Sequence, residues 1–328
     1  MRLLVLGGTK FVGRVVAEEA LARGWEVTAL NRGTQPAPEG VRVLKGDRTA
    51  QDGLAALGPG EWDAVVDTWS WAPAAVRDSA RFLNGRVGHY AYVSSRSVYD
   101  YPLEAGAGES APVVDSSPDL TGEVPYAEAK RGAELALEAE YGGQALLARA
   151  GLIIGPHENI GRLPWWLNRI AEGGPVLAPG PRDLPLQYID ARDLAAWTLD
   201  AVVARLGGPY NLVSPSGHTT MGELLEACVR ATGSDAELRW TAPERILAAG
   251  IEPWTELPIW LAPGDLYDFL HTGLVERALG AGLRCRPVAE TVEDTWAWLR
   301  SIGGSAPQRA DRVTVGLDRE RETAVLNG

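Results

Sequence analysis

The segment RLLVLGGTKFVG, residues 2–13, joins an apolar run directly to a glycine-rich turn. The run has the length of a buried β-strand, and a helical pattern follows from Val12 to about Arg23, before Gly24, a favourable C-terminal cap. A strand, a glycine turn and a helix in this order suit a pyrophosphate group, because the amides at a helix N-terminus point toward the anion. The segment therefore predicts the first unit of a dinucleotide-binding domain.

The glycines of this turn keep only part of the expected spacing. Gly7 and Gly13 take the first and last positions of a GxxGxxG pattern, but Lys10 replaces the central glycine. Lys10 is one of three lysines in the chain, and its ammonium could reach a phosphate of the cofactor. The alternative is a solvated loop residue. The residues of the turn expected to contact the cofactor are Gly7, Thr9, Lys10, Phe11, Val12 and Gly13.

Beyond the turn, short β-rich runs alternate with helical patterns, which is typical of a parallel sheet. The expected fold is α/β, a Rossmann-type doubly wound parallel sheet with a smaller C-terminal substrate lobe. The predicted strands are 2–7, 26–31, 42–46, 63–68, 89–95 and 145–151, and a strand-helix-strand segment, 186–213, returns to the sheet. We expect the dinucleotide-binding domain at 1–155 and 184–213, the substrate-binding lobe at 156–183 and 214–328, and a tail, 309–328, that is a loosely packed helix or partly disordered.

The end of the second strand favours NADP as cofactor. An acidic residue about 20 positions beyond the glycine turn reads the ribose 2′-hydroxyl of NAD. Here the strand ends in Asn31 and Arg32, so no carboxylate repels a 2′-phosphate and a guanidinium can bind it. NAD remains possible. Further cofactor-binding candidates follow the third and fourth strands: Asp47, Arg48, Asp67 and Thr68, although Asp47 is equally well explained as a turn residue.

Ser95, Tyr126 and Lys130 form the candidate catalytic set. Tyr126 and Lys130 are four residues apart in a predicted helix, so their side chains lie on one face. A phenol with a pKa near 10 becomes an acid-base group at neutral pH when a cation stabilises its phenolate, which Lys130 would supply. Tyr126 would then exchange a proton with a carbonyl oxygen as hydride passes to or from nicotinamide, and Ser95 would orient that oxygen. Alternatively, Tyr126 is an ordinary half-buried helix residue.

These features together resemble the extended short-chain dehydrogenases/reductases, which include the NAD-dependent epimerases and dehydratases acting on nucleotide sugars. The resemblance rests on the turn from Gly7 to Gly13, YVSSRSVY (92–99), the Tyr126–Lys130 pair, RAGLIIGP (149–156) and QYIDARDLA (187–195). It implies a doubly wound nucleotide domain with a C-terminal substrate lobe. It also implies that Ser95, Tyr126 and Lys130 are catalytic, with Lys130 touching the nicotinamide ribose as well.

Candidate substrate contacts come from the end of the fourth strand and from the loop after the Gly-Pro turn. They are Trp69, Trp71, Arg96, His157, Arg162, Trp165 and Trp166. For any single tryptophan a core position is the alternative, since large aromatic side chains bury readily. Arg96 either anchors an anionic or carbonyl group of the substrate or forms a structural ion pair. His157 has no second histidine at ligand spacing, so no metal is expected.

The leading functional hypothesis is an NADP-dependent oxidoreductase that transfers hydride at a carbonyl or alcohol carbon of a small molecule. A nucleotide-sugar epimerase, which oxidises and re-reduces one carbon with retained cofactor, shares every catalytic residue. A non-catalytic dinucleotide-binding regulator is the alternative of another class, although such a protein needs neither Tyr126 nor Lys130.

Composition excludes several other classes. The formal net charge of −12 and pI near 4.9 leave no basic face for nucleic acid or an anionic membrane. Cys228 and Cys285 stand far apart without a metal-binding or disulfide pattern, and no apolar run is long enough to span a membrane. We therefore expect a cytoplasmic protein with a small-molecule substrate. The family resemblance places a possible homodimer interface on the helices predicted at 73–83 and 127–141.

Overall fold

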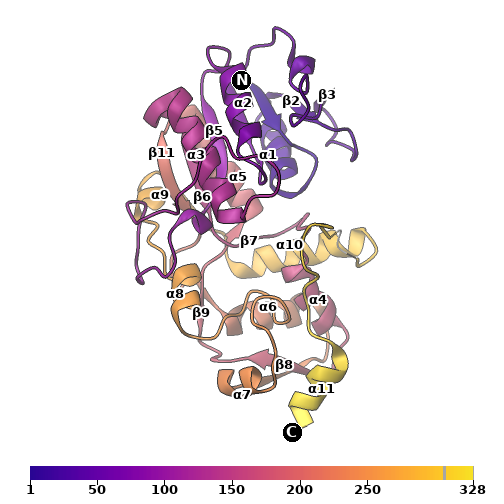
Figure 1. The fold of residues 1–328 in the computed structure, drawn as a ribbon. Coiled ribbons are helices and arrows are strands. Elements are labelled where there is room, and N and C mark those ends of the chain that lie inside the picture. The colour runs from indigo at the N-terminus through magenta and orange to yellow at the C-terminus, as the bar shows by residue number, and fades with distance from the viewer. Residues whose placement is uncertain (306–307, 328) are drawn as a thin grey trace.

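A computed structural model describes residues 1–305 and 308–327. Its centre is a seven-stranded sheet with the order β11-β6-β5-β4-β1-β2-β3, in which every neighbouring pair is parallel (Figure 1). The strands are β1 Arg2–Leu6, β2 Glu26–Asn31, β3 Arg42–Lys45, β4 Ala64–Asp67, β5 Tyr90–Ser95, β6 Leu146–Ala150 and β11 Gly208–Leu212. The predicted Rossmann-type sheet is therefore confirmed, with each strand within two residues of its expected ends.

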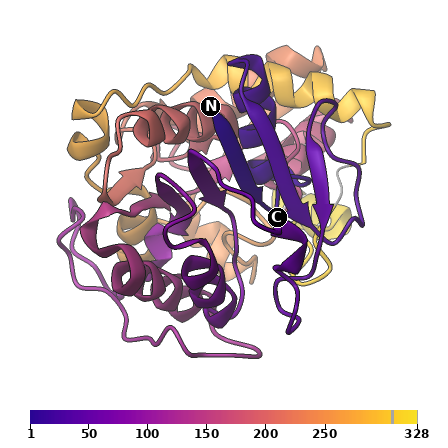
Figure 2. The ribbon, with the colours of Figure 1, turned by 90° about the horizontal axis from the view of Figure 1, so that it is seen from above.

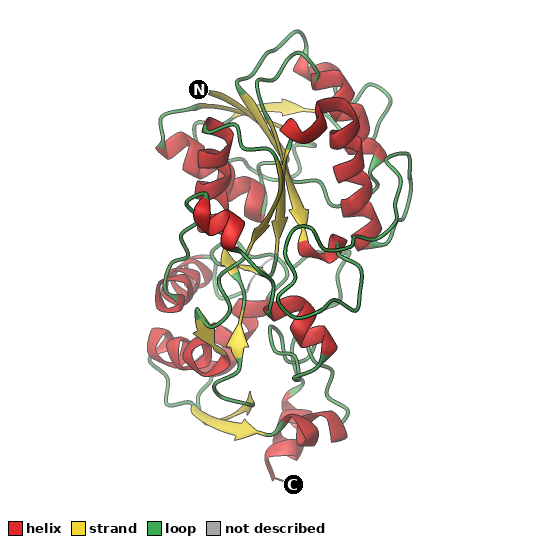
Figure 3. Cartoon of the chain, turned by 90° about the vertical axis from the view of Figure 1, so that its left-hand side faces the viewer, coloured by secondary structure: helices red, strands yellow, loops and turns green. Residues whose placement is uncertain are grey.

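Helices cover both faces of the sheet, as the view from above and the side view show (Figures 2 and 3). Along β1, Leu3 and Val5 pack on one face while Leu4 and Leu6 pack on the other, because side chains alternate along a strand. The first face is covered by α1 Phe11–Ala22 and α5 Ala191–Val203, and the second by α2 Ala74–Leu83 and α3 Tyr126–Tyr141.

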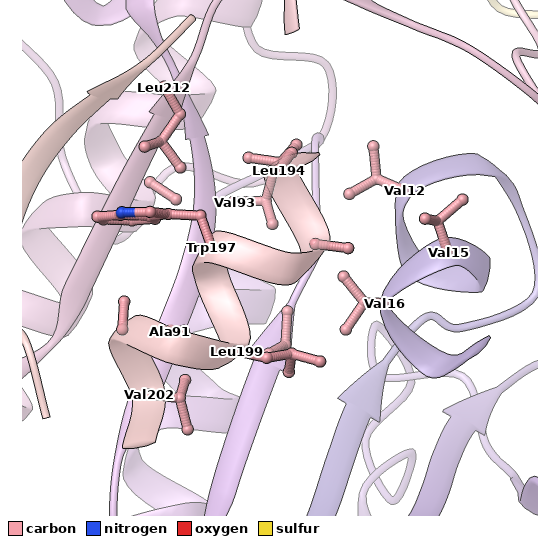
Figure 4. Close-up of a cluster of buried hydrophobic side chains, with 14 of the residues drawn as sticks. Val12, Val15, Val16, Ala91, Val93, Leu194, Trp197, Leu199, Val202 and Leu212 are labelled. Atoms are coloured by element: carbon pink, nitrogen blue, oxygen red, sulfur yellow. The ribbon is translucent and has the colours of Figure 1, made fainter. Parts of the chain in front are cut away.

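The packing of α1 against α5 fixes the N-terminal end of α1 over the sheet. Val12, Val15 and Val16 of α1 face the apolar side chains of α5, among them Leu194 and Leu199 (Figure 4). The strand order reverses between β1 and β4, so the connections from these two strands leave in opposite directions. In doubly wound sheets the crevice at this reversal, beyond the carboxyl ends of the strands, is where ligands bind.

A smaller lobe lies below the sheet in Figures 1 and 3. Three of its helices, α4 Arg162–Ala171, α6 Met221–Thr232 and α10 Val288–Ser301, pack together around a core that contains the fully buried Trp166 and Trp260. Its strands β8 Pro175–Pro179 and β13 Glu237–Thr241 form a parallel pair. The remaining helices are α7 Pro243–Ala248, α8 Asp265–His271, α9 Glu276–Gly280 and α11 Arg319–Asn327.

Short elements connect the two parts. The strand β7 Ile153–Ile154 pairs with β10 Ile189–Asp190, and β9 Pro185–Leu186 pairs with β12 Thr219–Thr220. The single-turn helices, in contrast, belong to the part that holds the seven-stranded sheet: they are η1 Ala55–Leu57, η2 Arg96–Val98 and η3 Gly142–Gln144. The chain crosses the expected boundary twice: Leu184, Leu186 and Tyr188 join the lobe's core, while Ala278 and Leu283, around α9, pack into the core of the sheet beside β11.

The C-terminal tail is anchored to the lobe. Glu322 of α11 is buried, pairs with Arg169 at 2.7 Å and accepts a hydrogen bond from the Leu177 amide at 2.9 Å. The expected helix is present as α11, and it packs on the lobe through the buried side chains of Glu322 and Val325. Gly328 lies outside the described residues. No helix in the described ranges combines the length and apolar character that a membrane span requires.

Candidate active site

The glycine turn between β1 and α1 is too crowded for side chains. A Cβ on Gly7 would lie 2.5 Å from Thr68 Oγ1, and one on Gly13 would lie 2.7 Å from the Gly8 backbone nitrogen. Gly7 and Gly8 also have positive φ angles of 124° and 84°, which glycine adopts without strain. The turn thus lets α1 approach the ends of β1 and β4 closely and leaves backbone amides open to an anion.

A cavity of about 1680 Å³ lies beyond this turn, at the carboxyl ends of the strands. Every residue predicted to bind the cofactor lines it, with the exception of Asp67. These residues are Gly7, Thr9, Lys10, Phe11, Val12, Gly13, Asn31, Arg32, Asp47, Arg48, Thr68, Tyr126 and Lys130. The glycine cradle, the helix N-terminus and the size of the cavity fit a dinucleotide.

Asp67 lies outside this lining because its carboxylate is fully buried and has partners. Arg48 donates to both carboxylate oxygens, at 2.6 and 2.7 Å, and the Tyr90 hydroxyl and the Trp69 amide donate to them at 2.8 and 3.0 Å. Arg48 also donates to the Ala75 carbonyl at 3.0 Å. Asp67, predicted to contact the cofactor, instead anchors the end of β4, because a charge buried there requires a cation and hydrogen-bond donors.

The end of β2 presents hydrogen-bond donors. Asn31 Oδ1 accepts from the Gly33 amide at 2.8 Å, and Asn31 Nδ2 is buried without a hydrogen-bond partner among the described residues. Arg32 is exposed beside it and lines the cavity. Asp47 is the turn residue that its alternative interpretation described: Oδ1 accepts from Thr49 N and Oγ1, hydrogen bonds that lower the pKa of Asp47. The free donors at Asn31 and Arg32 match a group that only accepts hydrogen bonds.

Tyr126 opens α3, and Lys130 lies one turn later, buried beneath it. Lys130 Nζ donates to the backbone carbonyls of Trp69 and Val93, the latter at 2.7 Å, and lies 6.0 Å from the centre of the Tyr126 ring. Burial lowers the pKa of the Lys130 ammonium to about 7. The hydroxyl of Tyr126 donates to no group in the described part of the chain, so it is free to meet a ligand in the cavity.

Ser95 ends β5 and caps η2. Its Oγ accepts from the Ser97 amide at 3.1 Å and lies 3.1 Å from Ser97 Oγ. Ser94, its neighbour, donates instead to buried Glu134 at 2.7 Å, and Glu134 forms an ion pair with Arg149 at 2.8 Å. Ser94 lines the same cavity as Ser95, Tyr126 and Lys130, but its hydroxyl is already used within the domain.

Four of the predicted substrate contacts line the cavity, and three do not. Trp69, Trp71, Arg96 and Arg162 do. His157, Trp165 and Trp166 are not brought to the site. The His157 ring contacts that of Trp298 at 5.4 Å, Trp165 packs beside Gly316, and Trp166 is fully buried and donates to the Pro258 carbonyl at 2.7 Å. The tryptophans of α4 thus hold the lobe together.

Arg96 joins the nucleotide domain to the lobe without an ion pair. It is buried and donates to the carbonyls of Phe269 and Leu270 at 3.0 and 2.9 Å, near the C-terminal end of α8. A Cβ on Gly273 would lie 2.1 Å from the Arg96 guanidinium. The structural ion pair considered from the sequence is absent within the described residues. The guanidinium is held instead by these two carbonyls, which lie at the C-terminal end of α8, the negative end of the helix dipole.

A comparison with protein-family models now adds to this geometry. The model described as the NAD dependent epimerase/dehydratase family matches residues 3–213. The chain belongs to this family.

Several solved structures have a fold similar to that of this member of the NAD dependent epimerase/dehydratase family. The Bordetella bronchiseptica enzyme WbmH, in complex with NAD+, has a TM-score of 0.66 and 18% identity, with 92% of this chain and 99% of that one covered. UDP-glucose 4-epimerase of Thermus thermophilus, in complex with NAD, has a TM-score of 0.62 and 21% identity over the same shares. UDP-glucuronic acid 4-epimerase of Bacillus cereus, in complex with NAD, has a TM-score of 0.64 and 13% identity, again over 92% and 99%. A comparison with curated proteins gave no match.

Sequence reasoning missed the cavity residues that reach this family member's site from the C-terminal half. They are Trp254, Leu266, Phe269 and Leu270 from the lobe, and Gln308, Arg309, Asp311 and Arg312 from the segment before α11. No local pattern marked them, because each comes from a loop or short helix far along the chain from Tyr126. Among the described residues, no group of three histidine, cysteine, aspartate or glutamate side chains could hold a metal ion.

Burial of Lys130 predicts a pH dependence of stability. The ordinary lysine pKa is 10.5 and the folded value is about 7, so between these values the unfolded chain binds one more proton than the folded chain. The free energy of unfolding contributed by this group therefore rises with pH across that window. Lys130→Met removes this slope, and its stability relative to the parent is expected to be most favourable below pH 7.

Urea denaturation at pH values from about 6 to 9 measures this effect. Lys45→Met, at an exposed lysine, is the matched control and should leave the slope unchanged. Parallel pH profiles for the parent protein and Lys130→Met would show that the ammonium is not held at a lowered pKa.

Proposed function

We propose that this protein is an NADP(H)-dependent oxidoreductase of the short-chain dehydrogenase/reductase type that transfers hydride at a carbonyl or alcohol carbon of a small molecule. The observation that carries the proposal is the presence of two hydrogen-bond donors at the end of β2: the unpartnered side-chain amide of Asn31 and the guanidinium of Arg32. A 2′-phosphate accepts hydrogen bonds only, so two donors and no carboxylate acceptor at the strand end suit NADP better than NAD.

The nicotinamide cofactor, when bound, donates or accepts the hydride. The chain's own residues handle the proton. Tyr126 gives a proton to the carbonyl oxygen of the substrate, or takes one from the alcohol, and the Ser95 hydroxyl donates a hydrogen bond that orients the same oxygen. Lys130 supplies positive charge beneath Tyr126, where Trp69 and Val93 carbonyls hold its ammonium in place. Gly7 and Gly13 would hold the pyrophosphate against the N-terminus of α1.

Arg32→Ala is expected to weaken NADPH binding by about 1.5 to 3 kcal/mol, the scale of a hydrogen bond to a charged group, and to leave NADH binding nearly unchanged. Fluorescence titration of both nucleotides measures the two dissociation constants. Arg42→Ala removes an equally exposed arginine of β3 outside the cavity and serves as the control. Equal affinity of the parent protein for NADPH and NADH would refute the assignment of NADP.

A nucleotide-sugar epimerase is the second candidate, because two of the similar structures are UDP-sugar 4-epimerases in complex with NAD. Both candidates use Ser95, Tyr126 and Lys130, so the fate of the cofactor separates them. Purified protein is denatured and its nucleotide content measured, and NADPH oxidation is followed with a panel of aldehydes and ketones. Net oxidation by exchangeable NADPH supports the oxidoreductase. Stoichiometric bound NAD with no net oxidation supports the epimerase.

A further inference from the structure

The C-terminal segment, residues 308–312, returns from the lobe to the cavity. It follows α10, and the chain then continues to α11 at the far end of the lobe (Figure 1). The Arg309 amide donates to the Asn159 carbonyl at 3.0 Å. Four residues beyond Arg312, Gly316 packs so closely on Trp165 that a Cβ there would lie 2.1 Å from the indole nitrogen. The segment is thus held at Arg309 and again beyond Arg312.

Both arginines of the C-terminal segment lie over aromatic rings of the site. The Arg309 guanidinium carbon is 5.1 Å from the centre of the Trp71 ring, and that of Arg312 is 4.9 Å from the centre of the Tyr126 ring. Arg162 lies in the same region, over Trp254 at 4.9 Å. Arginine over an aromatic ring forms a cation–π contact, which holds the guanidinium while leaving its N–H groups free to bind an acceptor.

The charges around Tyr126 are positive, although the chain's formal net charge is −12. Arg309 is paired with Asp311 at 2.6 Å, whereas Arg312 has no carboxylate within ion-pair distance in the described part of the chain. Arg162 Nε is buried without a hydrogen-bond partner there. Burial is the main cause that lowers the pKa of Lys130; the carboxylates of Asp67 and Glu134 oppose this, and the charges of Arg309 and Arg312 lower the pKa further.

Arg162 responds to the same field. Burial lowers the pKa of Arg162, the nearby Glu158 carboxylate opposes this, and the charge of Arg312 lowers it further. Like charges gathered around one cavity repel one another, and a bound anion removes that repulsion. Arg309 has its partner in Asp311, but the guanidinium of Arg312 has no ion pair and Arg162 Nε has no hydrogen-bond partner among the described residues, which indicates that an anion belongs in the cavity.

We propose that Arg312, together with Arg309 and Arg162, binds an anionic group of the substrate, a carboxylate or a phosphate, next to the carbonyl carbon that reacts at Tyr126. This inference rests on the proposed function for the identity of the reacting carbon. It names the class of substrate as small acidic carbonyl compounds or alcohols. The aromatic rings of Trp71 and Trp254 form walls beside the arginines, and the C-terminal segment determines specificity through its charge.

The cofactor's own phosphates are the other source of negative charge, but they belong elsewhere in the cavity. The glycine turn and the N-terminus of α1 suit the pyrophosphate, and Asn31 with Arg32 suits a 2′-phosphate. Arg312 lies over Tyr126 instead, the residue placed at the reacting carbon. An anion bound by Arg312 therefore neighbours that carbon.

Calorimetric titration of the protein saturated with NADP+ tests this assignment, because the cofactor's phosphates are then already bound. The probes are malonate and inorganic phosphate, with uncharged malonamide as the control ligand. We expect saturable binding of at least one anion, no binding of malonamide, and at least about ten-fold weaker anion binding for Arg312→Ala and Arg312→Gln. Arg300→Ala, at an exposed arginine of α10 outside the cavity, should bind as the parent does.

Three results would overturn the inference. They are no anion binding by the parent protein, equal anion binding by the parent and both Arg312 variants, and weakened NADP+ binding in these variants without a change in anion binding. The last result would assign Arg312 to the cofactor.

A second measurement separates this inference from the proposed function. NADPH oxidation is compared between 2-oxo acids and their methyl esters. Equal rates for acids and esters, unchanged in Arg312→Ala, would refute the inference while supporting the oxidoreductase. Anion binding that depends on Arg312, without oxidation of NADPH by any carbonyl compound, would support the anion site while refuting the oxidoreductase.

Discussion

Tyr126→Phe is expected to lower kcat by about two to four orders of magnitude, the range of a lost general acid or base, with little change in NADPH affinity. The variant keeps the ring that packs beneath Arg312 and above Lys130, and it loses only the hydroxyl that faces the cavity. NADPH oxidation with the best carbonyl substrate of the panel measures the rate, and fluorescence titration measures the affinity.

Tyr141→Phe is the matched control for this variant. Tyr141 is on the same helix, but its hydroxyl donates to the Ala80 carbonyl at 3.1 Å and is outside the cavity. Its loss should leave kcat near the parent value. If Tyr126→Phe kept most of the parent rate, the proton would have to come from another group. His157 does not line the cavity, so Ser95 would be examined first.

Arg48→Met is expected to destabilise the protein by about 3 to 5 kcal/mol, because it leaves the fully buried carboxylate of Asp67 without its cation. Urea denaturation without nucleotide measures the free energy of unfolding. Arg77→Met is the control, since Arg77 pairs with the exposed carboxylates of Asp78 and Asp119 and should contribute at most about 1 kcal/mol.

A double variant identifies the cause of that destabilisation. Asp67→Asn carries no charge: its oxygen can still accept from the Trp69 amide, and its NH2, in the place of Oδ2, can donate to the Tyr90 hydroxyl oxygen. Arg48→Met with Asp67→Asn should therefore recover much of the stability that Arg48→Met loses. A loss in Arg48→Met no larger than in Arg77→Met would mean that the buried pair contributes little.

The sheet could be predicted because its information is local. Each strand is a short apolar run between turn residues, and the alternation of strands with helices restricts the topology to a parallel sheet. The Tyr126–Lys130 pair was equally accessible, since a spacing of four residues on a helix brings side chains together regardless of the rest of the fold. Both inferences use only residues that are close in sequence: a single strand for the sheet, and about two helical turns for the Tyr126–Lys130 pair.

Predictions that depended on packing between distant segments were less successful. Arg162 and Trp166 are four residues apart and share a face of α4, but Arg162 begins the helix at the cavity, whereas Trp166 lies one turn further along, inside the core of the lobe. Asp67 ends β4 as expected, but its carboxylate forms a buried ion pair with Arg48 and does not line the cavity. No sequence pattern marked Arg309 and Arg312 as site residues, because only the fold places them over the rings of Trp71 and Tyr126.

The path of the C-terminal segment has a consequence for when the site is completed during synthesis. The last sheet strand, β11, ends at Leu212, so the whole nucleotide-binding sheet has been translated well before Arg309 and Arg312. Every strand of the sheet, and the helix α9 that packs beside β11, is therefore synthesised before the arginines that complete the cavity. The same order matters for proteolysis: one cut between residues 302 and 305 would break the covalent link between α10 and the arginines while leaving every strand of the sheet intact.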